Sequence, residues 1–142
     1  MNIGVVKLDE RAYTPEHRAD DFSNINIYCL DDIKVDVSAH NSLFIKTGLS
    51  FIIPDGFELS IVPYIKTFLN YGIAIETYEP AVFTEATNKR ECILKCHLGG
   101  RSRPSNEYES NSKYIIIPKE SCIAIGLFRK KEYPTINVVA IK

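Results

Sequence analysis

Apolar and polar residues alternate along much of this chain, and this pattern predicts β-strands. In the segment FELSIV, residues 57–62, apolar residues recur at every second position, as in a strand with one buried face. Comparable segments predict further strands at residues 3–8, 22–30, 33–37, 47–53, 73–75, 91–98, 114–117, 122–128 and 134–141, and residues 43–46 lead into the strand at 47–53. One helical turn is expected at 66–71. The pattern therefore predicts about eleven short strands in an all-β, jelly-roll-like sandwich or barrel.

Turn residues separate these segments. Pro54-Asp55-Gly56 is the clearest turn, because proline presets φ and glycine accepts a positive φ. Pro63 should end the strand that follows this turn, since proline cannot donate to the ladder. Tyr71-Gly72 is expected to bend the chain into the strand at 73–75.

Length and composition indicate one domain, residues 1–142. The net charge is −1 and the pI about 6.3, so overall charge gives no reason to expect nucleic-acid binding. No apolar run approaches the roughly 20 residues that span a bilayer. The first residues also lack the features of a secretory signal. We therefore expect a cytoplasmic protein without membrane contact.

The chain contains four cysteines, Cys29, Cys92, Cys96 and Cys122, and no C-x-x-C pair. Cys92 and Cys96 lie four residues apart in an alternating segment, so they should share one face of a strand. We expect all four to be reduced, buried thiols. Their spacing does not predict a zinc site, and we predict no metal site.

The stretch from Thr47 to Ile75 contains TGL, IPDGFE, a strand that ends in proline, and YGIAI. It resembles the central segment of the trimeric dUTP diphosphatases (dUTPases), in register and without a gap. LDERAYTP, at 8–15, resembles the opening of the same family, and the resemblance extends from Lys7 to Ile141. It implies a dUTPase-like jelly-roll or β-clip barrel. It also implies a homotrimer in which the C-terminal strand is exchanged between subunits.

The polar residues of the family's motifs are not preserved. Asn26 stands where the first motif has an aspartate, and Tyr64-Ile65-Lys66 replaces the phosphate-binding R-S-G of the second. Ile125 replaces the glutamine of the fourth motif. These substitutions remove the groups that would support a metal and a triphosphate.

The third motif and the C-terminal arm also differ from the family. The catalytic aspartate of the third motif aligns with Phe83 or Thr84, and neither residue is a base. Glu85 is the nearest carboxylate and a weak candidate for that role, because it is shifted along the chain. No counterpart of the family's Gly-rich arm follows Ile141, so we expect the lid over the triphosphate to be missing.

Our preferred hypothesis is a catalytically inactive dUTPase-like protein that binds, and could sequester, a nucleotide or nucleotide-derived signal. The Lys/Ile/Asn-rich composition is compatible with a phage or viral protein acting in the host cytoplasm. Candidate ligand contacts are the aromatic and cationic residues near the motif positions: Tyr64, Lys66, Lys89, Arg90, Arg101 and Arg103.

Two alternatives remain open. The polar segment Gly99–Lys113, which includes Tyr108, could bind a protein partner and make the chain an interaction module. Residual dUTP hydrolysis through Glu85 is the second alternative. It would require Mg²⁺, whereas the preferred hypothesis requires no cofactor.

Overall fold

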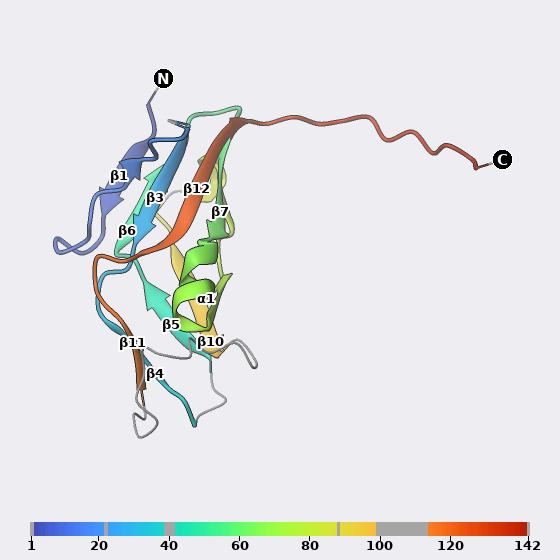
Figure 1. Ribbon diagram of the computed structural model, residues 1–142. Helices are drawn as coiled ribbons and strands as arrows, with labels where there is room; N and C mark the ends of the chain where they lie inside the picture. Colours follow the sequence, from blue (N-terminus) through green and yellow to red (C-terminus); the bar gives the residue numbers. More distant parts are fainter. Residues whose placement is uncertain (1, 22, 39–41, 88, 99–113, 142) are drawn as a thin grey trace.

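The computed structural model describes residues 2–21, 23–38, 42–87, 89–98 and 114–141. Within these ranges the protein is built from antiparallel strands, with one short helix and one 3₁₀ turn (Figure 1). The strands are β1 (Gly4–Lys7), β2 (Glu16–His17), β3 (Asn24–Tyr28), β4 (Ile33–Asp36), β5 (Leu43–Lys46), β6 (Leu49–Ile52), β7 (Phe57–Pro63), β8 (Ile73–Thr77), β9 (Val82–Phe83), β10 (Ile93–Leu98), β11 (Tyr114–Ile117) and β12 (Cys122–Lys130). The helix is α1 (Ile65–Tyr71) and the 3₁₀ turn is η1 (Glu85–Thr87). The all-β prediction is confirmed.

The largest sheet has five strands in the order β2-β3-β12-β7-β9. A three-stranded sheet has the order β5-β10-β8, and β1-β6 and β11-β4 form two further pairs. Neighbours in the sheets are often far apart in sequence, as β3 and β12 are. The long strand β12 runs between β3 and β7 and so holds the two halves of the largest sheet together (Figure 1).

The core is formed by the inward residues of the alternating strands. In β3, Ile25 and Ile27 are buried, whereas Asn24, Asn26 and Tyr28 are half-buried on the other face. A period of two with one buried face is what the sequence pattern predicts. The outer face of β3 is therefore available to build a site.

Two phenylalanines form the aromatic centre of the core. Phe51 of β6 and Phe83 of β9 are both fully buried, and their rings pack edge to face with centroids 5.1 Å apart. This geometry is the favoured one for an aromatic pair. Phe83, the candidate position for a catalytic aspartate, is thus a core residue.

Close packing also fixes the identity of one residue in β12. A Cβ added at Gly126 would lie 2.9 Å from Cγ1 of Ile25 and 3.0 Å from Cδ1 of Leu59. Both atoms belong to core side chains on the neighbouring strands. A larger residue at Gly126 would force β12 away from β3 and β7.

The turn predictions are confirmed at two glycines. Gly56 has φ +85° after Pro54, and Gly72 has φ +69° at the C-terminal end of α1, where its N–H donates to the Phe68 carbonyl (2.8 Å). Helix α1 spans seven residues, slightly more than the single turn expected. The hydroxyl of the buried Thr67 donates to the Cys122 carbonyl at 3.4 Å and connects α1 to β12.

Two predictions need correction. The strand predicted at 134–141 does not form; the chain leaves β12 at Lys130 and extends away from the body (Figure 1). A strand needs a neighbouring backbone for its N–H and C=O groups, and a single chain supplies none here. The loop predicted at 9–21 contains β2, a two-residue strand on the edge of β3. An element this short leaves almost no pattern in the sequence.

Removing the Phe51 ring tests the assigned core. Phe51→Ala should lower the free energy of unfolding by about 3–5 kcal/mol, because it leaves a cavity beside Phe83. Phe44→Ala is the matched control, since Phe44 is 59% exposed and loses mainly an edge contact to Tyr78, which is worth at most about 1.5 kcal/mol. Urea unfolding measures both changes. Equal losses in the two variants would contradict the assigned core.

Candidate functional site

Two of the substituted motif positions lie side by side on the outer face of the largest sheet, and the third lies next to them. In the ladder, Asn26 of β3 is opposite Ile125 of β12, and Ile125 is opposite Val62 of β7. Residues directly opposite each other in an antiparallel pair share a face. Tyr64 follows β7, and its N–H donates to the Ile123 carbonyl at 3.0 Å. The first, second and fourth motif positions therefore converge at one place.

Arg18 brings a positive charge to this place. The Arg18 N–H donates to the Asn24 carbonyl (2.9 Å), which holds the residue at the sheet edge just after β2. Its Nη1 donates to Oδ1 of Asn26 at 2.7 Å, and the guanidinium carbon lies 5.5 Å from the centroid of the Tyr64 ring. The arginine is only 22% exposed. It therefore connects the first motif position with the second.

Arg18 was not among the residues predicted from the sequence to form the site. It lies in a segment that was expected to be a loop, and its place beside Asn26 depends on the pairing of β2 with β3. The available signal was weak: an arginine shortly after Pro15 and before the alternating segment of β3.

Tyr64 also borders an apolar hollow of about 390 Å³. The hollow is lined by residues from the end of β7, from α1 and from β8: Pro63, Tyr64, Ile65, Phe68, Ala74 and Ile75. Apolar and aromatic walls with a few polar groups at the rim are typical of small-molecule sites. Tyr64 thus lies between an apolar hollow and the Arg18 guanidinium.

The other predicted ligand contacts are not all at this site. Lys66 lies on α1, two residues after Tyr64, and is exposed. Lys89 and Arg90 lie between β9 and β10; both are exposed, and Arg90 pairs with Glu79 at 3.7 Å. Arg101 and Arg103 lie outside the described residues, as does the whole segment 99–113, including Tyr108. Of the predicted ligand contacts that lie in the described part of the chain, Tyr64 is therefore the one with a contact to Arg18.

Glu85 is held by a lysine at the start of the C-terminal tail. Nζ of Lys131 donates to both carboxylate oxygens of Glu85, at 2.8 and 2.9 Å. This hydrogen-bonded ion pair lowers the pKa of Glu85 below its usual value of 4.5 and raises the pKa of Lys131. A carboxylate with a lowered pKa, paired with an ammonium group, is a weaker proton acceptor.

The described residues do not form a metal site or a reactive thiol. Among them, no group of three His, Cys, Asp or Glu residues could hold a metal ion. The four cysteines are free, as expected, and Cys122 is the half-buried one. Burial raises the pKa of Cys92 to about 12 and that of Cys96 to about 11, so both remain protonated thiols.

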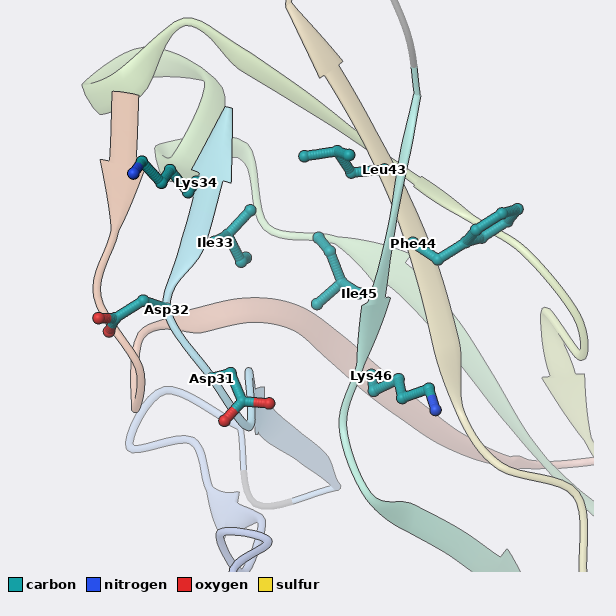
Figure 2. Close-up of a pocket in the computed structure, with 8 residues that line it drawn as sticks. All are labelled: Asp31, Asp32, Ile33, Lys34, Leu43, Phe44, Ile45 and Lys46. Atoms are coloured by element: carbon teal, nitrogen blue, oxygen red, sulfur yellow. The ribbon is translucent and has the colours of Figure 1, made fainter. Parts of the chain in front are cut away.

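A second hollow, of about 310 Å³, lies between β4 and β5 (Figure 2). Its walls are formed by eight residues: Asp31, Asp32, Ile33, Lys34, Leu43, Phe44, Ile45 and Lys46. Three of its four charged groups have partners within the chain. Asp31 pairs with Arg11 at 3.2 Å, Asp32 accepts the Lys119 N–H at 2.8 Å, and the Lys34 ammonium lies 4.0 Å from the centroid of the Tyr114 ring. We therefore place the candidate site at Arg18 and Tyr64 instead.

The fold and the position of the site define a dUTPase-like β protein. In sequence the chain is similar to the deoxyuridine 5′-triphosphate nucleotidohydrolase of Hydrogenobaculum sp., with 28% identity over 118 residues that cover 83% of this chain and 81% of that protein. It is similar to the same enzyme of Crocosphaera subtropica at 25% identity, with the same coverage. No protein-family model matches the chain.

Solved structures confirm the fold. The dUTPase of phage phi11 of S. aureus superimposes with a TM-score of 0.71 at 15% identity, covering 100% of this chain and 98% of that one. The dUTPase of Staphylococcus bacteriophage 80alpha superimposes with a TM-score of 0.71 at 14% identity. The match covers 99% of this chain and 97% of that one. Together with the sequence matches, these likenesses support the predicted resemblance of the chain to the dUTPase family. Within the described residues, no helix is long and apolar enough to cross a membrane.

Replacing Lys131 tests the ion pair that holds Glu85. In Lys131→Met the pKa of Glu85 should rise toward 4.5, because the cation that stabilises the carboxylate is gone. Lys130→Met, at the exposed neighbouring position, is the control and should leave the pKa of Glu85 unchanged. Carbon-13 NMR titration of the Glu85 carboxyl group measures this pKa in both variants.

Because the pKa of Glu85 is lowered in the folded protein, the ion pair with Lys131 makes the free energy of unfolding depend on pH. The pair stabilises the native state above the unfolded pKa of Glu85, and this contribution is lost as the pH falls through the lower, folded pKa. Identical Glu85 titration curves in the wild type and in Lys131→Met would contradict the assignment.

Proposed function

We propose that this protein binds a nucleotide or nucleotide-derived signal on a dUTPase scaffold and does not hydrolyse dUTP. The observation that carries the proposal is the position of Tyr64, between the apolar hollow and the Arg18 guanidinium. A nucleotide has two parts that complement these features: a flat base, which suits the apolar hollow, and an anionic phosphate, which suits the guanidinium. Aromatic stacking and arginine–phosphate contacts are the usual means of binding them.

The residues present at the site favour binding over hydrolysis. Hydrolysis of an anhydride needs a positioned base and, in most enzymes of this kind, a metal that neutralises the developing charge. The residues that align with the family's catalytic base are Phe83 and Thr84. Phe83 is buried in the core, and the Thr84 hydroxyl accepts the Ala86 N–H at 3.2 Å. Ile125 places an apolar side chain in the centre of the site. Bound nucleotide would therefore be retained intact.

We further propose that the chain acts as a homotrimer with exchanged C-terminal segments. The segment from Tyr133 to Ile141 extends away from the body, and its apolar residues are almost fully exposed: Ile136 87%, Val138 95% and Ile141 100%. Exposed apolar residues in an extended segment are stabilised when they add to the sheet edge of another chain. The trimer implied by the family resemblance supplies such an edge.

Residual dUTP hydrolysis is the second candidate. The curated relatives are named nucleotidohydrolases, and this favours hydrolysis. The pairing of Glu85 with Lys131 counts against it.

A regulatory role through a protein partner is the third candidate. The 80alpha dUTPase is described as controlling transfer of virulence genes by a G protein-like mechanism, which is a precedent for this scaffold acting as a regulator. Likeness to two phage proteins is also compatible with a phage origin and a location in the host cytoplasm.

Binding calorimetry against a panel of nucleotides and cyclic oligonucleotides tests the proposed function. We expect at least one member to bind the wild type. Tyr64→Ala should weaken that binding about tenfold or more, since base–aromatic stacking contributes roughly 1–3 kcal/mol. Tyr78→Ala is the matched control, because Tyr78 is 45% exposed and packs on Phe44 instead. No binding to any member of the panel would contradict the proposal.

Light scattering coupled to gel filtration tests the exchanged trimer. The wild type should have three times the 16.1 kDa mass of one chain. Placing aspartate at both Ile136 and Val138 should dissociate it, because charges would replace apolar residues on one face of the added strand. Aspartate at Thr135 and Asn137, on the opposite face, should preserve it. A monomeric wild type, or a trimeric Ile136/Val138 variant, would overturn this part of the proposal.

A further inference from the structure

We infer that the ligand of this site carries a single phosphate group, held by Arg18 without a metal ion. The inference rests on the proposed function and specifies its ligand class. The ligand would be a nucleoside monophosphate or a phosphodiester. A triphosphate would not fit the charge of the site.

The arginine is held in place before any ligand arrives. Its backbone is fixed to Asn24, its Nη1 donates to Asn26, and its planar group lies near the Tyr64 ring. A guanidinium has five N–H donors, and the contacts to Asn26 and to Asp20 (3.3 Å from Nε) use two of them. The remaining N–H groups are donors that a phosphate could accept from. Little side-chain entropy is then lost on binding.

Asn26 keeps the charge of Arg18 available. Its amide oxygen accepts a hydrogen bond from the guanidinium but carries no charge. An aspartate at this position, as in the dUTPase motif, would neutralise Arg18 and repel a phosphate. The substitution that removes a metal ligand thus leaves the exposed Asp20 as the carboxylate that pairs with Arg18 among the described residues.

The acidic neighbours of Arg18 do not cancel this charge. Asp20 is 72% exposed, so water screens its interaction with the guanidinium. Glu16 lies opposite Asn26 in the ladder and is also exposed, so water screens its charge as well.

The charge at the site matches one phosphate group and not three. A nucleoside triphosphate carries several negative charges, which proteins neutralise with a divalent metal and several cationic groups. Among the described residues no metal site is formed, and Ile125 and Val62, which follow Asn26 across the sheet, add no cation. Lys66 on α1 is exposed and contributes at most a hydrated point charge. One guanidinium can neutralise the single charge of a phosphodiester and about half the charge of a phosphomonoester.

Calorimetry with matched ligands tests this inference. The probes are the 2′-deoxynucleoside 5′-monophosphates of uracil, cytosine, adenine and guanine in EDTA, the corresponding nucleosides, and the corresponding triphosphates with Mg²⁺. A monophosphate should bind the wild type at least about tenfold more tightly than its nucleoside, as charged hydrogen bonds allow. It should also bind more tightly than its triphosphate with Mg²⁺.

Three variants assign the effect to Arg18. Arg18→Met should remove the difference between monophosphate and nucleoside while leaving nucleoside binding within about twofold. Asn26→Asp, which keeps the shape and the hydrogen bond to Arg18, should weaken monophosphate binding about tenfold. Arg129→Met is the control: Arg129 is 55% exposed on β12, pairs with Glu58, and should have no effect. Thermal unfolding checks that each variant is folded, and Arg18→Lys replaces Arg18→Met if the latter is not.

The outcomes separate this inference from the proposed function. If monophosphates bind the wild type and Arg18→Met equally, the role of Arg18 is wrong and the nucleotide-binding proposal stands. If triphosphates with Mg²⁺ bind more tightly than monophosphates, or if Asn26→Asp strengthens monophosphate binding, the single-phosphate inference is wrong. If no nucleotide in either panel binds, the proposed function fails and this inference fails with it.

Discussion

The pairing of β12 with β3 on one side and β7 on the other is the constraint on which the rest of the structure depends. It places Asn26, Ile125 and Val62 in one row on the outer face of the sheet. It also packs core residues around Gly126, where a Cβ would contact side chains of both neighbouring strands. One register therefore determines the core on one face and the site on the other. A shift of one residue would exchange the two faces.

This two-faced arrangement explains how the scaffold can be retained while the polar motif residues change. Inward residues such as Ile27 and Phe83 are fully buried and constrained by volume. Outward residues such as Asn26 and Ile125 are half-buried and can change with little effect on packing. Similarity to dUTPases in fold thus does not require similarity in chemistry. Asn26 in place of an aspartate preserves the strand and alters the charge at the site.

Much of the fold could be predicted from the sequence because alternation is a local signal. β3, β7 and β10 follow the predicted segments closely, and the turns at Gly56 and Gly72 have the expected positive φ. The site was only partly predictable. Tyr64 was identified because it occupies a known motif position, whereas Arg18 acquires its role through the pairing of two short segments. The pairing of Glu85 with Lys131, 46 residues apart, likewise leaves no trace in a local pattern. The strand expected at 134–141 does not form, because alternation in the sequence does not supply the neighbouring backbone that a strand needs.

The central claim is that the dUTPase scaffold persists here without dUTP hydrolysis. Pyrophosphate release from dUTP in the presence of Mg²⁺, measured on the purified wild-type protein, tests it most directly. The account predicts a rate no higher than that of a reaction without protein. Sustained release over many turnovers, reduced in Glu85→Gln, would contradict it and would identify a working hydrolase.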